Sequence, residues 1–567
     1  MIRHRMRRGV AIALASLVAA TLSACVGIPT SGSVIAGRAV SEQEPGGVEF
    51  VPEGPVSGAD QETILRGFVA AFNGSGDYEV AREFLSGGFA GQWNPRESVL
   101  VRTGSVRYNQ VDDATMDYTI NTSAAVDANG TYTAFPSAPQ TQRFHFVQEE
   151  GEWRISSAPN GIVLSSGTFA TIFSEHILYF LDPSRQSLVP DLRWFPGGTA
   201  ATRIVSALLA GPPPWLLGAV GTAFPDGTQL TSPKRVAVDS DVAIVDLTAD
   251  ALEANREQRQ LMRVQLEASL GRLASISTVS ISVDGTPLVI ADLGADAPQS
   301  HPQVDGRMLV FKDGQFGYYA NGRLAPISQI SEQVAATSPT DAILGAGGAV
   351  AATLGKAGVY IVVAAEPDSA PPQAMLVDPR PGLIGPSLDP YGYVWSAQRS
   401  SPASIRVFTQ QGVAQDVVAN LPAGAQIVSL DVSRDGARVA VLLDTDAGPR
   451  MMVSAIARDA TRNFAPLSLG EPRLDAIVEA ETAVDATWLD EVTVAALTAT
   501  GGESSVFGYR IGGQRTSLGS PQDAISIVGG NGENALRVVD ADGVVGARRG
   551  NGWQSTQVKV SFIAGQR

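Results

Sequence analysis

"VSRDGARVAVLL", residues Val432–Leu443, is a polar turn followed by an apolar run. The Asp435-Gly436 pair is typical of a tight turn, and the run after it has the length of a buried strand. The same order recurs in "GAGGAVAATL", "LDPYGYVWSA", "WLDEVTVAAL" and "GGNGENALRVV", with turns near positions 348, 392, 436, 491 and 532. A period of roughly 40–50 residues filled with short strands is typical of propeller blades. With an earlier hairpin at Asp313-Gly314, we expect an all-β propeller of about six blades over residues 300–567.

The region before the repeat, residues 186–292, mixes helix and strand patterns and predicts an α+β domain. The stretch "LVPDLRWFP" has the pattern of a strand. Apolar stripes predict two helices, one over Ile204, Val205, Leu208 and Leu209 and one over Met262, Leu266, Leu270 and Leu273. Hairpin turns are expected at Asp239–Asp241 and Asp284-Gly285.

Residues 61–166 predict a further α+β domain, with helices first and a meander of strands after them. One helical face carries Ile64, Leu65, Phe68, Val69 and Phe72. This order of elements resembles the cone-shaped NTF2-like domains, some of which are enzymes with a polar pocket. The histidine of this region, His145, alternates with Phe144 and Phe146, so we expect it on the solvent face of its strand.

The first 24 residues have the pattern of a secretory signal peptide, a basic segment "MIRHRMRR" followed by the uncharged "GVAIALASLVAATLSA". The apolar run is short of the ~20 residues that a spanning helix needs. Residues 25–60 are rich in Gly, Ser, Pro and Glu and predict a flexible tether. A buried N-terminal helix is the alternative for the apolar run.

Leu22-Ser23-Ala24-Cys25 resembles a bacterial lipobox, and Cys25 is the single cysteine of the chain. The resemblance implies that signal peptidase recognises Leu22, Ser23 and Ala24 and cuts before Cys25. It also implies that Cys25 carries diacylglycerol and an N-acyl chain such as palmitate, which would anchor the chain on the extracytoplasmic face of the cell membrane. The alternative is an ordinary signal peptide cleaved after Ala24, with a free thiol left over.

Composition excludes several function classes. The net charge of −16 disfavours nucleic-acid binding, and one cysteine excludes an internal disulfide framework. The three histidines downstream of Cys25 (His145, His176 and His301) are scattered and show no metal-ligand spacing. The segment "DVSRDG" starts like a calcium loop but has Leu442 where the closing glutamate is needed. We therefore expect no catalytic, cofactor or metal residues and no enzyme activity.

Residues 186–292 resemble the GerMN domain of spore germination proteins and bacterial lipoproteins, through "ALLAGPP", "AFPDGTQL", "VAIVDLT" and "LGRLASISTVSISVDGTPL". The whole order, with "GIPTSG" after Cys25, "LVPDLRWFP" and "SRDGARVAV", resembles the actinobacterial LpqB lipoprotein family. That family is implicated as a partner of the MtrA–MtrB two-component system. The resemblance implies binding to the external domain of the MtrB kinase, with effects on cell-wall growth and division.

Three functions stay in competition. The first is a non-catalytic lipoprotein that binds and modulates a sensor histidine kinase. The second is a receptor for a cell-wall fragment or another small ligand, with the propeller opening as the pocket. The third is a hydrolase whose carboxylates come from several blades, which would require acids that converge in the central opening.

Overall fold

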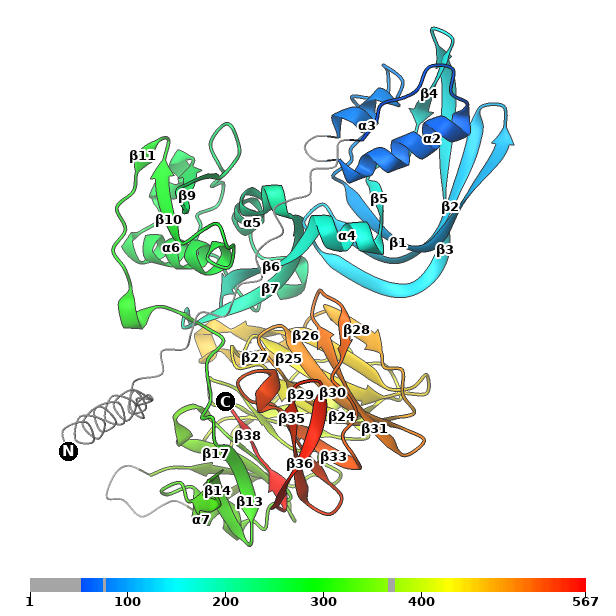
Figure 1. The fold of residues 1–567 in the computed structure, drawn as a ribbon. Helices are drawn as coiled ribbons and strands as arrows, with labels where there is room; N and C mark the ends of the chain where they lie inside the picture. The colour runs from blue at the N-terminus through cyan, green and yellow to red at the C-terminus, as the bar shows by residue number, and fades with distance from the viewer. Residues whose placement is uncertain (1–51, 75–77, 366–372) are drawn as a thin grey trace, which may run out of the picture. The chain divides into compact units, whose positions relative to one another are not determined.

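The structure is a computed structural model that describes residues 52–74, 78–365 and 373–567 (Figure 1). All of them fall in one compact unit, Pro45–Arg567. The expected signal peptide, most of the expected tether and the lipobox residues Leu22, Ser23, Ala24 and Cys25 lie outside the described residues. Of the helices in the described ranges, none combines the length and the apolar composition needed to cross a membrane.

Helices and a five-stranded sheet of order β4-β3-β2-β1-β5 form the first domain. Its elements are α2 (Gln61–Ala70), α3 (Glu79–Glu83), β1 (Ser98–Asp112), β2 (Thr115–Asp127), β3 (Tyr132–Glu149), β4 (Glu152–Ser157), β5 (Ile162–Ser165) and α4 (Ser166–Ile172). The Asp60 carboxylate caps α2 by accepting the Thr63 N–H at 2.9 Å. Ile64, Leu65 and Phe68 on α2 are buried in one cluster with residues of the sheet. The α+β prediction for this region is confirmed.

His145 lies on β3 between two buried phenylalanines, Phe144 and Phe146, and is itself exposed. Successive side chains of a strand point to opposite faces, which explains the difference. The Nδ1 atom of His145 lies 3.2 Å from Oγ1 of Thr115. The expectation of a surface histidine is confirmed.

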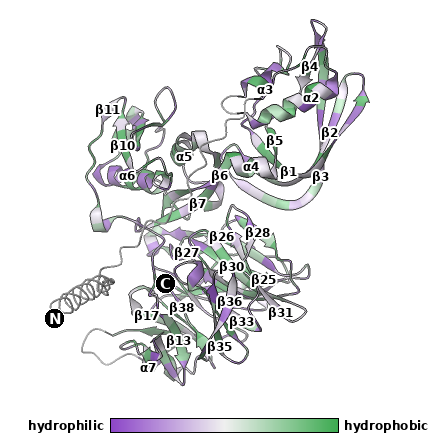
Figure 2. Cartoon of the chain, viewed as in Figure 1, coloured by the Kyte–Doolittle hydropathy of each residue, from purple (hydrophilic) through white to green (hydrophobic). Residues whose placement is uncertain are grey.

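The second domain contains two sheets, of order β12-β7-β6 and β11-β10-β9-β8. Its elements are β6 (Phe173–Leu181), β7 (Ser187–Pro196), α5 (Ala200–Leu209), β8 (Ala237–Asp239), β9 (Val242–Leu247), α6 (Arg256–Leu270), β10 (Thr278–Val283), β11 (Thr286–Pro287) and β12 (Gln299–Ser300). Both predicted apolar stripes are buried on α5 and α6, except that Leu209 is partly buried and Leu273 follows the end of α6. Hydrophilic residues show along α6 in Figure 2, as an amphipathic helix requires.

The strand β6 extends this domain beyond its predicted start at Gln186. It pairs antiparallel with β7 over its whole length, from Phe173 opposite Pro196 to Leu181 opposite Leu188. The segment "FSEHILYFL" is buried along most of β6 and shows no polar alternation. Without alternation, a short apolar run does not reveal which element it pairs with.

The last part of the chain forms six sheets, antiparallel except for one pair of strands, which are the blades of a propeller. Blade 1 contains β37, β13, β14 and β15, blade 2 contains β38 and β16 to β19, and blades 3 to 6 follow in chain order. The bounds are β13 (Met308–Lys312), β14 (Gln315–Ala320), β15 (Arg323–Ala325), α7 (Ser331–Ala336), β16 (Asp341–Leu344), β17 (Val350–Gly355), β18 (Gly358–Val363), β19 (Met375–Asp378), β20 (Ser387–Leu388), β21 (Val394–Gln398), β22 (Ser401–Phe408), β23 (Ala414–Asp416), β24 (Gln426–Val432), β25 (Arg438–Asp444), β26 (Arg450–Asp459), β27 (Ala465–Leu469), β28 (Leu474–Ile477), β29 (Thr482–Trp488), β30 (Thr493–Thr500), β31 (Glu503–Arg510), β32 (Arg515–Ser517), β33 (Ala524–Val528), β34 (Arg537–Asp540), β35 (Val544–Arg549), β36 (Gly552–Lys559), β37 (Phe562–Ile563) and β38 (Gly565–Gln566).

Neighbouring inner strands contact one another from β37 through β16, β20, β24 and β29 to β33, and β37 also contacts β34 of blade 6, which closes the sheets into a ring around a central channel. The five predicted turns all connect an inner strand to the next strand outward. Gly436 shows why one of these positions needs glycine. Its φ is +72°, and a Cβ there would lie 2.7 Å from the side chain of Pro390. The prediction of about six blades is confirmed.

The C-terminal residues close the ring. β37 pairs with β13 and so supplies the inner strand of blade 1. β38 pairs in parallel with β16 in blade 2. The predicted Asp313-Gly314 hairpin therefore joins the second and third strands of blade 1, whereas the other predicted turns join first and second strands.

Candidate functional site

The strand β7 joins the three domains. Arg193 donates to the carbonyl of Asn129 at 2.7 Å and to Thr131 Oγ1 at 3.1 Å in the first domain. Its guanidinium also pairs with Asp191 two residues earlier on β7, and both side chains are buried. Removal of an ion pair from water costs free energy, and the hydrogen bonds of Arg193 to the first domain offset part of that cost.

The next residue on β7, Trp194, connects the first domain to the propeller. Its indole stacks on Tyr132 with ring centroids 5.2 Å apart. The indole Nε1–H donates to the carbonyl of Gly512 at 2.9 Å, and Gly512 lies between strands β31 and β32 of blade 5. The guanidinium of Arg473 on the propeller in turn donates to the Tyr132 carbonyl at 3.0 Å. We call the contacts of β6, β7 and their hairpin turn with the other two domains the joint.

A second set of contacts within the joint centres on Glu491, in the turn between β29 and β30. The Tyr179 hydroxyl of β6 donates to both carboxylate oxygens of Glu491, at 2.9 and 3.0 Å. Arg272 completes the cluster with an ion pair of 2.7 Å to Glu491. Burial, followed by the negative charge of Glu491, raises the pKa of Tyr179, so the phenol stays a donor at neutral pH.

A third set of contacts begins at the turn between β6 and β7. The Tyr391 hydroxyl donates to the Asp182 carboxylate of this turn at 2.7 Å. The Arg458 guanidinium lies over the Tyr391 ring, 4.3 Å from its centroid. Arg458 then pairs with Asp389 at 2.8 Å, and both side chains are fully buried. The blade turn "LDPYGY" is thus one of the propeller segments that form the joint.

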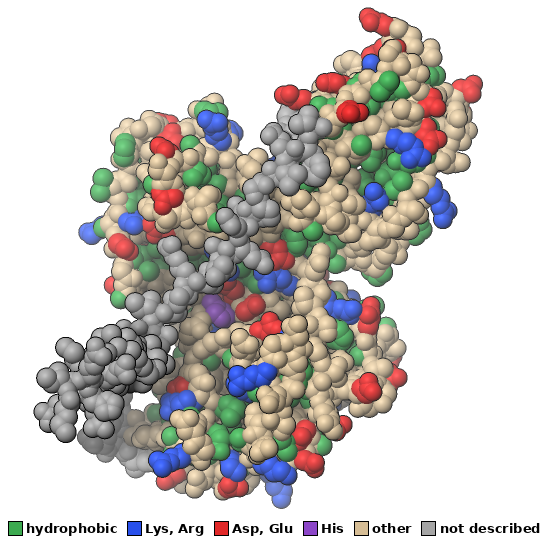
Figure 3. Space-filling view, in the orientation of Figure 1, with side chains coloured by type: hydrophobic (Ala, Val, Ile, Leu, Met, Phe, Trp, Pro, Cys, Tyr) green, Lys and Arg blue, Asp and Glu red, His purple; other side chains and the backbone are tan. Residues whose placement is uncertain are grey.

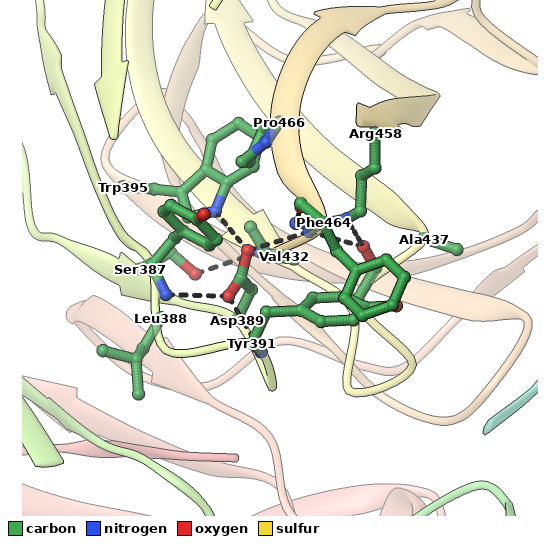
Figure 4. A network of polar contacts seen from close by, with 12 residues as sticks. Ser387, Leu388, Asp389, Tyr391, Trp395, Val432, Ala437, Arg458, Phe464 and Pro466 are labelled. Atoms are coloured by element: carbon green, nitrogen blue, oxygen red, sulfur yellow. Dashed lines mark hydrogen bonds and ion pairs between the residues drawn. The ribbon is translucent and has the colours of Figure 1, made fainter. Parts of the chain in front are cut away.

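The ion pair of Asp389 and Arg458 is satisfied from all sides (Figure 4). Asp389 accepts the indole N–H of Trp395 at 3.1 Å and two backbone N–H groups. Arg458 donates to the carbonyls of Gly436 and Phe464. Because every partner is structural, the pair orders the blade turns and offers no open binding position.

Other segments of the same chain cover the propeller face that carries these turns. Besides the joint, Arg434 donates to the carbonyl of Pro302 at 3.1 Å, and Val304 N–H donates to Asn531 at 3.0 Å. A cavity of about 20 Å³ remains between these segments, lined among others by His301, Arg438 and Glu491. A second cavity, beside Arg307 and Arg537, measures about 80 Å³. Pockets for small molecules usually measure roughly 300–1,000 Å³.

The inner strands of three blades carry acids, which the hydrolase hypothesis requires to converge in the central channel. They are Asp341 on β16, Asp431 on β24 and Asp485 on β29. Burial raises the pKa of Asp341 to about 7, with a further contribution from the Asp485 charge, and burial raises that of Asp485 to about 6. No group of three or more His, Cys, Asp or Glu in the described ranges could hold a metal ion.

These acids also have structural partners. Asp485 accepts the backbone N–H groups of Ala486 at 2.8 Å and Ile527 at 2.9 Å. Asp431 forms an ion pair with Arg567, and Asp341 accepts the Ala342 N–H at 2.7 Å. Asp485 therefore connects two inner strands and Asp431 holds a cation, and this arrangement gives the hydrolase hypothesis no specific support.

The calcium-like segment "DVSRDG" is a blade turn. Asp435 accepts the Ser433 hydroxyl at 2.6 Å and the Ala437 N–H at 2.9 Å, and it also pairs with Arg438. Asp431 belongs to the channel instead. Asp431 and Asp435 therefore bind different partners and do not act as two ligands of one ion.

The histidines of the described ranges lie on separate elements. His176 on β6 is buried, and burial lowers its pKa to about 4. His301 lines the small cavity, where burial and the Arg434 charge lower its pKa. With His145 on β3, no two of them belong to one element. Acidic and basic side chains mix over the face drawn in Figure 3.

Sequence reasoning found the segment "LVPDLRWFP" but not its role. The available signal was the presence of Asp191, Arg193 and Trp194 in a strand whose other residues are mostly apolar. A charged pair in such a strand must have partners from another segment when it is buried. The partners, Asn129 and Gly512, lie too far away in the sequence to be identified from it.

An α+β domain, a GerMN domain and a six-bladed propeller, in that order, define a class of multi-domain protein. Family models match each part: "Lipoprotein LpqB, N-terminal domain" over residues 54–170, "Sporulation and spore germination" over 177–289, and "Lipoprotein LpqB beta-propeller domain" over 314–561. The chain belongs to the LpqB lipoprotein family.

Relatives named lipoprotein LpqB span different shares of the chain. The one from Bifidobacterium longum is 27% identical over 492 residues, 82% of each chain. The one from Cutibacterium acnes is 30% identical over 289 residues, 50% of this chain and 48% of that relative. Among solved structures, the first GerMN domain of the sporulation protein GerM from Bacillus subtilis is 18% identical, with a TM-score of 0.18, and the match covers 22% of this chain and 97% of that one.

Proposed function

We propose that the chain is a membrane-anchored, extracytoplasmic lipoprotein that binds and modulates an MtrB-like sensor histidine kinase without catalysing a reaction. Lipid on Cys25 holds it at the membrane, and its effect on the kinase influences cell-wall growth and division. Membership of the LpqB family supports the lipoprotein part of this proposal.

The joint is the observation that carries the binding role. Hydrogen bonds from the buried Arg193 connect β7 to the first domain, and phenol-to-carboxylate hydrogen bonds connect β6 and its turn to the propeller. Such contacts fix the domains relative to each other, and a fixed arrangement presents one continuous surface to a partner at low entropic cost. An enzyme or a small-ligand receptor needs an accessible cavity instead, and the cavities of about 20 and 80 Å³ on the propeller are smaller than typical small-molecule pockets.

The test uses the full chain, with wild-type protein in nanodiscs and the Cys25→Ser chain in solution. Purified external domain of the kinase is titrated against both, and cross-links are mapped by mass spectrometry. We expect saturable binding with the same Kd for both forms, because lipid anchors the chain but does not contact the kinase. Failure of both forms to bind at low and at high salt would remove the basis of the proposal.

A panel of cell-wall fragments, tested by thermal shift on the same protein, addresses the receptor alternative. A ligand that binds only the folded state raises Tm. We expect no shift from the panel. A fragment that raises Tm, together with absent kinase binding, would replace the proposed function with the receptor function.

A further inference from the structure

The inner strands of blades 3, 4 and 5 are linked to their neighbours in one repeated way. In each, the penultimate residue accepts a backbone N–H at the end of the next inner strand: Ser387 from Val432 at 3.0 Å, Asp431 from Trp488 at 3.3 Å, and Thr487 from Gly529, the residue after β33, at 3.0 Å. These side-chain to backbone bonds, here called stitches, hold together blades 3 to 6.

The equivalent positions in the other half of the ring cannot form such stitches. The penultimate residues of β16, β33 and β37 are Ile343, Ile527 and Phe562, whose side chains have no hydrogen-bond acceptor. The segment 562–567 spans this half. It supplies the inner strand β37 to blade 1, pairs β38 with blade 2, and ends with Arg567, whose N–H donates to the Leu344 carbonyl at 2.9 Å.

The Arg567 side chain crosses from blade 2 to the first stitches. Its Nε donates to the Leu388 carbonyl at 3.2 Å, and Nη2 donates to Ser387 Oγ at 3.3 Å and pairs with Asp431. Asp431 therefore uses one oxygen for its stitch to Trp488 and the other for Arg567. The guanidinium is almost completely buried in the channel.

We propose that Asp431, Ser387 and the Leu388 carbonyl form a guanidinium-binding site in the propeller channel, and that Arg567 fills this site as the latch that closes the ring between blades 2 and 3. The site selects a guanidinium over an ammonium because its acceptors lie on two strands. A planar fork of five N–H donors reaches them together, whereas a point charge does not. The ligand class is a monosubstituted guanidinium.

Burial lowers the pKa of Arg567 to about 10, so the guanidinium stays charged at neutral pH. Asp341 and Asp485 add two further carboxyls to the same channel. Removal of the cation would leave Asp431 without its ion-pair partner, and a small guanidinium from solution could then replace it. This is the basis for a rescue experiment.

The experiment compares the full-length Arg567→Ala chain with wild type in thermal unfolding. We expect a fall of several degrees in the propeller transition, and partial recovery with millimolar methylguanidinium but not with methylammonium at equal ionic strength. The control is Arg549→Ala, which removes an exposed arginine from blade 6 and should show neither the fall nor the recovery.

A second substitution tests the site itself. Asp431→Asn in the Arg567→Ala background removes the anionic acceptor and should abolish the methylguanidinium effect. Arg567→Lys serves if Arg567→Ala does not accumulate, because it keeps the charge but loses the fork, and it too should recover with methylguanidinium alone. An unchanged Tm in Arg567→Ala, or equal recovery with both cations, would overturn the proposal.

Discussion

Single buried charges set much of the energetics of the propeller. Asp389 and Arg458 have no solvent contact, and each has a full set of partners. Asp341 and Asp485 face the channel, where burial favours their protonated forms. Asp389 and Arg458 neutralise each other, whereas burial alone disfavours the charged forms of Asp341 and Asp485, so we expect different effects when the carboxylates are replaced by amides.

Removal of one partner from the Asp389 and Arg458 pair should be costly. We expect Asp389→Asn to lower the free energy of unfolding by about 3–5 kcal/mol, because it leaves a buried cation without its counter-ion. The measurement is chemical denaturation followed by tryptophan fluorescence, since Trp395 contacts Asp389. The matched control is Asp416→Asn, from the exposed pair with Arg406 in blade 3, which should cost at most about 1 kcal/mol. Equal effects would contradict the expectation.

Asp341→Asn should stabilise the propeller in a pH-dependent way. The pKa of Asp341 is about 7 in the folded chain, against about 3.9 when unfolded. The folded state therefore binds the proton more tightly, and the stability gained from Asp341 at low pH is lost as pH rises from about 4 through about 7. The neutral asparagine avoids this loss. The free energy of unfolding of Asp341→Asn, relative to that of wild type, should therefore rise by up to about 4 kcal/mol between pH 4 and pH 8.

Denaturation curves of both proteins across this pH range measure the difference. Asp446→Asn, in an exposed turn of blade 4, is the control and should track wild type at every pH. A constant difference between Asp341→Asn and wild type would show that Asp341 does not titrate as described.

At the scale of elements, local patterns predicted the blades well because each blade turn combines a flexible residue with an apolar strand. The stretch around Asp435-Gly436 and the helix stripe over Ile204, Val205 and Leu208 are both reproduced in the structure. The closing strands β37 and β38 were not separated from the sixth blade, because two-residue strands have no periodicity. Their partners β13 and β16 lie more than two hundred residues earlier, and no local pattern encodes such pairing.

The joint between β6, β7 and the propeller should loosen when its phenol donors are removed. We expect the double variant Tyr179→Phe and Tyr391→Phe to keep its aromatic packing but lose hydrogen bonds to Glu491 and Asp182. Hydrogen bonds to charged groups contribute about 1.5–3 kcal/mol each. Amide exchange should therefore rise in β6, β7 and the blade turns but not elsewhere. Tyr319→Phe in blade 1 is the control, and uniform exchange changes in the double variant would argue against a local joint.

For the whole molecule, the domain order and the family followed from sequence, whereas the joint did not. The segments that meet there, near Asn129, Arg193 and Gly512, are separated by tens to hundreds of residues. Burial of Asp191 with Arg193 cannot be recognised until those partners are known. The sequence therefore identified the strand "LVPDLRWFP" but not the joint, because the joint is formed by contacts between domains.

Lipid attachment should affect location and not folding. We expect Cys25→Ser to release the chain from the membrane fraction, with unchanged thermal unfolding, because residues 52–567 form their own cores. Cell fractionation and mass spectrometry of the N-terminal peptide test this, with Ser31→Ala as a nearby control. Wild-type protein without covalent lipid would refute the assignment of Cys25.

The pairing of β37 with β13 also orders events during synthesis. The first two domains have all their strands once residue 300 has been made, and they can fold while the ribosome continues. The ring cannot close until residues 562–567 emerge, so blade 1 waits without its inner strand through the production of five more blades. During that interval the edge of β13 is open to pairing with other chains, and the arrival of β37 at this edge ends the exposure.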